Sequence, residues 1–95
     1  MEQLNRIQSM EIILDQGTAA LADLSAALET YAALRPQLER LAAYYEGPLW
    51  RQDFEDDEAD RLPADLKRGV LSEDAVYDLL MEQAQILTRM GELLP

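Results

Sequence analysis

The segment YYEGPLWRQDFEDDEADRLPADLKRGVLSEDAVYDLL, residues 44–80, decides how this chain folds, because it separates two stretches of helical sequence. It holds the only Trp, the only Phe and three of the four Tyr of the chain. Gly47 and Pro48 predict the end of a helix, since Gly tolerates the left-handed conformation after a helix and Pro cannot continue it. We therefore expect a compact elbow over about residues 47–71, built from short helical turns.

Inside the elbow, the sequence leaves open whether residues 49–61 form a helix or a loop. Leu49, Trp50 and Phe54 are spaced to share one face of a helix. Six acidic residues lie within positions 53–60, and like charges four positions apart oppose helix formation. The pattern is compatible with a short strained helix and with an irregular loop anchored by Trp50 and Phe54.

Before the elbow, apolar residues recur with a heptad spacing, which predicts a long helix over about residues 3–34. Two rows of residues, offset by three positions, form one apolar stripe, which we call the apolar seam. Because Pro disrupts the turn that precedes it, Pro36 predicts that the first helix stops or kinks near Leu34 and that a second helix follows over about residues 36–46. The rows of the seam are Ile7, Leu14, Leu21, Leu28 and Met10, Gly17, Leu24, Tyr31; the second helix has Leu38, Leu41, Ala42 and Tyr45 on one face.

After the elbow, Ser72 marks the start of a C-terminal helix over about residues 72–92. Its hydroxyl can accept a hydrogen bond from the free amides of the first turn, and Glu73 and Asp74 complement the helix dipole. Leu71 and Val76 occupy the two positions of a hydrophobic staple. The apolar face of this helix then consists of Val76, Leu79, Leu80, Gln83, Ile86, Leu87, Met90, Leu93 and Leu94.

These elements predict a single all-α domain over residues 1–95. A long N-terminal helix would pack against the shorter second helix and the C-terminal helix, as a helical hairpin or a three-helix bundle. Two copies could also pair through apolar surface left over on the first helix, which would give a homodimer.

The composition limits the functional classes. Nineteen acidic residues against eight basic ones give a net charge of −11, which should repel nucleic acid and anionic membranes and attract a basic protein partner. The absence of Cys and His removes disulfides, thiolate metal sites and the commonest general base. No apolar run approaches a membrane span, and residues 1–10 do not resemble a secretory signal. We therefore expect a cytoplasmic protein.

The acidic run is the candidate metal site. Mg²⁺ and Ca²⁺ prefer oxygen ligands, and four carboxylates here have the spacing of one helical face. This reading supports one alternative function, a divalent-metal-dependent phosphohydrolase of the all-α nucleotide pyrophosphatase type. The E-E-x-x-E pattern of those enzymes is matched only loosely by residues 55–58, and the last helix has no E-x-x-D. A solvated surface that needs no cofactor and a docking patch for a partner are the other interpretations. The candidate ligands are Asp53, Asp56, Asp57 and Asp60.

Aromatic and basic residues form the candidate binding surface. The aromatic side chains could present a platform to a partner, or they could fill the space where helices turn. The two basic residues could hold an anion near the start of the last helix, or neutralise part of the acidic run. We expect a non-enzymatic protein–protein interaction module that presents the elbow around Trp50 and the carboxylates of residues 53–60 to a basic partner protein. The residues are Tyr44, Tyr45, Trp50, Phe54, Lys67 and Arg68.

Two motifs carry a family resemblance, A-Y-Y-E-G-x-x-W over residues 43–50 and L-P-x-D-L-K-R-G-V-L-S-E-D over residues 62–74. With them, the chain resembles a family of short, acidic, all-helical bacterial proteins of unknown function, found mostly in Gram-positive bacteria. The resemblance covers nearly the whole chain. It implies a stand-alone all-helical protein, and it transfers no catalytic or binding residues.

Overall fold

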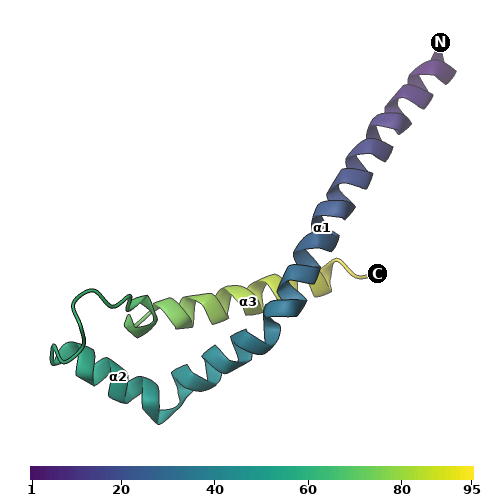
Figure 1. Cartoon of the computed structure of the whole chain (residues 1–95). Coiled ribbons are helices and arrows are strands. Elements are labelled where there is room, and N and C mark those ends of the chain that lie inside the picture. The colour runs from purple at the N-terminus through teal and green to yellow at the C-terminus, as the bar shows by residue number, and fades with distance from the viewer. The chain divides into compact units, whose positions relative to one another are not determined.

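The protein is all-α, as the sequence predicts. The computed structural model describes residues 1–95 and contains no strand. The chain divides into a first unit, Met1–Pro36, and a second unit, Gln37–Pro95. The predicted packing of the N-terminal helix against the other helices stays a prediction. The elements are α1 (Glu2–Glu46), α2 (Pro48–Glu58), the short 3-10 helix η1 (Gly69–Leu71) and α3 (Ala75–Glu92) (Figure 1).

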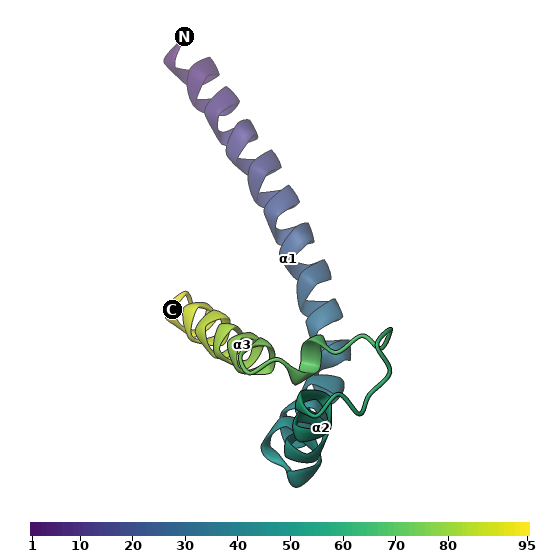
Figure 2. The same ribbon diagram turned by 90° about the vertical axis from the view of Figure 1, so that its left-hand side faces the viewer.

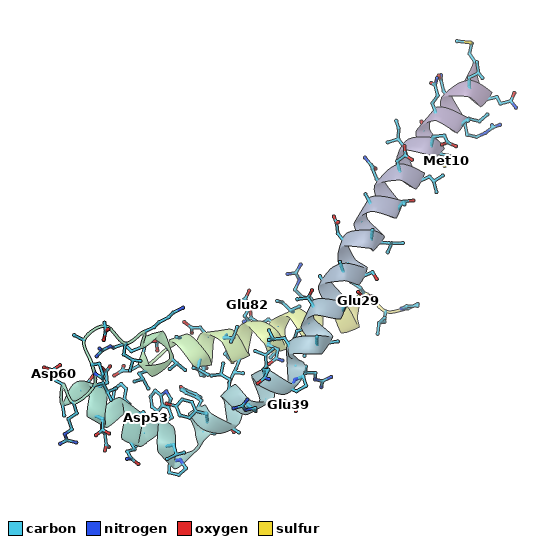
Figure 3. All side chains as sticks on the ribbon, in the orientation of Figure 1. Met10, Glu29, Glu39, Asp53, Asp60 and Glu82 are labelled. Atoms are coloured by element: carbon cyan, nitrogen blue, oxygen red, sulfur yellow. The ribbon has the colours of Figure 1, made fainter.

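The first unit is a single helix, the N-terminal part of α1. None of its residues is buried. The hydroxyls of Thr18 and Thr30 donate to the carbonyls of Leu14 and Ala26, one turn earlier, so these polar groups are satisfied within the helix. Met10 and Glu29, labelled in Figure 3, both belong to this helix. A single helix has no second element of its own against which to bury an apolar face.

The predicted stop of the first helix near Leu34 is wrong, because α1 continues through Pro36 to Glu46. The expected helices over residues 3–34 and 36–46 are therefore one helix. Pro36 has no amide proton for the carbonyl of Ala32, but Ala32 is exposed, so water can satisfy that carbonyl. The residues on both sides are mostly Ala, Leu, Glu, Gln and Arg, which have high helix propensity.

Gly47 separates α1 from α2, but not in the left-handed conformation that the sequence predicts. Its φ is −95° and its ψ is 174°, which is extended backbone. The reason for glycine is steric, since an added Cβ would lie 3.1 Å from the carbonyl oxygen of Ala43 and 3.6 Å from that of Tyr44. Pro48 then occupies the first turn of α2, where its missing amide costs nothing.

Residues 48–58 are helical, which resolves the ambiguity in the elbow in favour of a helix. After α2, the chain returns along this helix to η1, from which α3 departs, as both views of the ribbon show (Figures 1 and 2). η1 contacts both α2 and α3, so it is the point where the elbow closes.

The apolar core of the second unit is small and lies at this closure. Leu71 and Val76, the two predicted staple residues, are the two fully buried hydrophobic side chains, with 6% and 3% of their surface exposed. The predicted face of residues 36–46 is also confirmed, because its four apolar side chains are half-buried. On α3 the burial is partial: Leu80, Gln83 and Met90 are half-buried, whereas Leu79, Ile86, Leu87, Leu93 and Leu94 are exposed.

Candidate functional site

Three aromatic side chains stack at the start of α2. The ring of Trp50 lies 5.1 Å from that of Phe54 with an interplanar angle of 17°, one helical turn further on. The ring of Tyr45, from the end of α1, meets Trp50 edge-on at 5.1 Å and 73°. The indole Nε1–H of Trp50 donates to the carbonyl of Val70 in η1 over 2.9 Å. Trp50 therefore joins three elements, α1, α2 and η1.

Tyr44 and Asp53 form a second link between α1 and α2. The Tyr44 hydroxyl donates to Oδ2 of Asp53 over 2.6 Å, a short bond typical of a hydroxyl and a carboxylate. Burial of the half-buried phenol, followed by this hydrogen bond and the charge of Asp53, raises the pKa of Tyr44 to about 12. The neutral phenol is therefore the stable form, because its anion would lose the bond and face a carboxylate.

The end of α2 is closed by a left-handed residue and an ion pair. Asp60 has a φ of 59°, and the amides of Asp60 and Arg61 donate back to the carbonyls of Asp57 and Asp56. This pattern is a Schellman motif. Its usual hydrophobic contact is replaced by a 2.9 Å ion pair between Arg61 and Asp56, which occupy the same two positions of the motif.

Arg68 fastens the loop that follows α2. Its guanidinium donates to the carboxylate of Asp57 and to the carbonyl of Pro63, and its Nε donates to the carbonyl of Leu66 over 3.3 Å. The Arg68 side chain thereby joins two carbonyls of the loop after α2 and pairs with a carboxylate of α2. Both Arg68 and Asp57 are half-buried, so solvent screens this pair less than a fully exposed one.

These contacts explain why an acidic segment is helical. Carboxylates near the C-terminus of a helix are unfavourable with its dipole, and α2 has no basic residue in its last turn. Arg61 and Arg68 supply the missing positive charge from the loop beyond the helix. The cost of like charges is thus offset by residues that are not part of the helix.

The hydroxyl of Ser72 makes the predicted hydrogen bond to the start of the last helix, although the N-cap residue of α3 is Asp74, which makes no side-chain capping bond. The Oγ of Ser72 accepts a hydrogen bond from the amide of Ala75 over 3.1 Å, and its extended backbone suits a cap residue. The regular α3 begins at Ala75, three residues after the predicted start, because residues 73 and 74 form a turn.

The four candidate metal ligands do not converge. Asp53, Asp56 and Asp57 each bond to a different side chain, from Tyr44, Arg61 and Arg68. Asp53 lies midway along α2 and Asp60 beyond its end (Figure 3). No group of three or more acidic side chains lies together in the way that would hold a metal ion. The arrangement orients three of these carboxylates singly, and binding of Mg²⁺ or Ca²⁺ by the acidic run stays a prediction.

The six candidate binding residues fall into two groups. The rings of Tyr45, Trp50 and Phe54 contact one another, whereas Tyr44 and Arg68 bond to the carboxylates of Asp53 and Asp57 on α2. Lys67 is exposed. Sequence analysis did not identify Arg61 or the carbonyl of Val70 as part of the elbow. The spacing of five residues between Asp56 and Arg61 is the only signal for Arg61, and the sequence gives no signal for the carbonyl of Val70. Whether these residues bind a partner stays a prediction.

The fold and the elbow define an all-α protein. Its elbow is held together by stacked aromatic rings and by carboxylates of α2 that bond to side chains from the neighbouring segments. Residues 7–93 match the family described as Domain of unknown function (DUF4298). The match covers most of the chain, so the protein belongs to this family, and the expected membership of an uncharacterised family is confirmed. Comparison with curated proteins and with solved structures gives no match. No helix combines the length and apolarity that a membrane crossing requires.

Proposed function

We propose that this protein is a non-enzymatic interaction module that docks through the apolar seam of its first unit. One observation carries the proposal: the seam lies on a lone helix, and nothing within that unit covers it. Its six aliphatic side chains are between 40% and 67% exposed; they are Ile7, Met10, Leu14, Leu21, Leu24 and Leu28.

A stripe of this kind has a physical cost unless a partner covers it. Contiguous apolar patches larger than a few hundred Å² are rare on proteins that act alone, and they mark interaction sites. The repeat of seven residues keeps the stripe on one face over four heptads, which is the pattern that packs against another helix. We infer that the partner presents an apolar helix to the seam.

The polar groups of the elbow support an interaction role of a different kind. The aromatic rings and three of the carboxylates are engaged within the second unit, whereas Glu55, Glu58 and Asp60 are exposed. With a net charge of −11, the chain attracts basic surfaces and repels polyanions. A partner that touches the elbow as well as the seam is therefore basic at that contact.

The test is capture with matched charge variants of the full chain. Leu21→Glu/Leu24→Glu places two acids in the seam, and Ala22→Glu/Ala26→Glu places two acids on the opposite face of the same helix. We expect proteins from a lysate of the source organism, together with untagged copies of this chain, to be retained by the wild type and the second variant and lost by the first.

Both variants should show the same helical content by circular dichroism, so that a loss of binding reports on the seam. Equal capture by the two variants, or no capture by the wild type at any salt concentration, would refute docking through the seam.

A further inference from the structure

We infer that the apolar seam pairs with the seam of a second copy of this chain, with the two helices parallel and in register as a two-stranded coiled coil. The inference rests on the proposed function, because it names the partner of the same surface. In this arrangement Ile7 lies opposite Ile7 of the second copy, and the same holds along the seam to Leu28.

The edges of the seam allow two acidic chains to approach each other. Between residues 12 and 34, the positions that flank the seam hold only Ala, Ser, Thr, Ile and Leu. The three carboxylates of this stretch, Asp15, Asp23 and Glu29, all lie on the far side of the helix. Self-association through this face therefore brings no like charges together, although the whole chain carries a net charge of −11.

The two charges that do flank the seam select the orientation. Arg6 lies directly before Ile7, on one edge of the seam. Glu11 lies directly after Met10, on the other edge and five residues from Arg6. In a parallel, in-register pair, Arg6 of each copy faces Glu11 of the other, which gives two ion pairs by symmetry. Residues five apart in one helix are not neighbours on its surface, so the two charges do not satisfy each other within one chain.

The exposed apolar residues are numerous enough to sustain a dimer. The six aliphatic residues of the seam, with Leu4, Ile13 and Leu34 at its edges, are all between 40% and 67% exposed. Complete burial of one such side chain contributes about 1.5–3 kcal/mol, so covering the exposed half of these side chains contributes roughly 7–13 kcal/mol per helix. Both helices together therefore gain more than the cost of association, which is about 4–15 kcal/mol.

The length of the seam also favours a second copy. From Ile7 to Tyr31 it extends about 36 Å at 1.5 Å per residue, whereas the 18 residues of α3 extend only about 27 Å. A second α1 matches the seam over its full length, and α3 of the same chain does not.

The first experiment measures mass and orientation. By light scattering after gel filtration, the purified chain at about 100 µM should have twice its monomer mass of 10.8 kDa. The chain has no Cys, so single substitutions report cleanly. In a glutathione redox buffer, Ile7→Cys should form a disulfide-linked dimer, because the two residues face each other, whereas Ile12→Cys on the far side should not.

The second experiment tests the register by charge exchange. Arg6→Glu replaces two attractions by two repulsions and should weaken the dimer on the order of tenfold by analytical ultracentrifugation. Arg6→Glu/Glu11→Arg should restore the wild-type dissociation constant within about threefold. A double variant as weak as the single one would overturn the parallel, in-register pairing.

The outcomes separate this inference from the proposed function. A chain that stays monomeric, but still captures another protein that Leu21→Glu/Leu24→Glu loses, overturns self-pairing and leaves the seam as a docking site. Equal cross-linking of Ile7→Cys and Ile12→Cys also overturns the inference. A monomeric chain that captures nothing overturns both.

Discussion

Replacing Trp50 tests whether the aromatic side chains of the elbow hold the fold together. Trp50→Ala removes two ring contacts, with Tyr45 and Phe54, each contributing about 0.5–1.5 kcal/mol. It also removes the hydrogen bond to the carbonyl of Val70, a net contribution of about 1 kcal/mol. We therefore expect a loss of about 3 kcal/mol in the free energy of unfolding of the second unit.

Trp50→Phe divides this loss into its parts. A phenyl ring keeps the stack on Phe54 but cannot donate to Val70, so we expect a loss of about 1 kcal/mol. Leu49→Ala is the matched control, because Leu49 is the adjacent residue of α2 and is 62% exposed. It should change the free energy of unfolding by less than about 0.5 kcal/mol.

The assay is urea unfolding followed by far-UV circular dichroism, since the variants remove the only Trp and with it the fluorescence signal. If Trp50→Ala costs no more than Leu49→Ala, the stack does not stabilise the elbow, and its rings are free to serve a partner. A loss near 3 kcal/mol establishes a packing role, and binding assays on Trp50 variants must then be corrected for unfolding.

Three further predictions concern the elbow and its caps. Because the pKa of Tyr44 is raised from 10.0 to about 12, the folded state keeps a proton that the unfolded chain loses between these pH values. The free energy of unfolding should therefore be unaffected below pH 10 and fall between pH 10 and 12, and Tyr44→Phe should abolish that fall in alkaline unfolding titrations. Ser72→Ala should lower the free energy of unfolding by about 1 kcal/mol, because the amide of Ala75 loses its acceptor, whereas Ser72→Asp should retain it; equal losses in thermal unfolding would exclude a capping role. Asp60→Gly should raise the melting temperature, since glycine relieves about 1 kcal/mol of strain at a φ of 59°, and a lower melting temperature would show that the Asp60 carboxylate stabilises the turn.

Several elements of this protein follow from local sequence alone. The all-α class follows from helical periodicity on both sides of the elbow, and the hydrogen bond between the Ser72 hydroxyl and the first residue of the last helix follows from the position of Ser72. The staple pair, Leu71 and Val76, was predicted from its spacing around Ser72, and these are the two side chains that the fold buries. Such features depend on neighbours within five residues, so local sequence contains the necessary information.

Two other features were not decided by local sequence rules. The sequence around Pro36 favours a break by its missing amide, but helix propensity on both sides and the solvated carbonyl of Ala32 let α1 continue. The sequence of residues 53–60 is equally compatible with a loop. It shows the repulsion between like charges, but it does not show the bonds from Arg61 and Arg68 that offset this repulsion.

The sequence by itself determined the all-α class, the capping bond of Ser72, the apolar seam and the acidic charge of this protein, because each depends on short-range spacing or on composition. Only the tertiary structure decided what the elbow residues do. It engaged Tyr44, Trp50, Asp57 and Arg68 in contacts between segments nine to twenty residues apart, and it separated carboxylates that share a spacing but not a partner. The physical reason is that the role of a polar or aromatic side chain depends on the groups that it contacts. The turn of the chain at the elbow decides which groups these are.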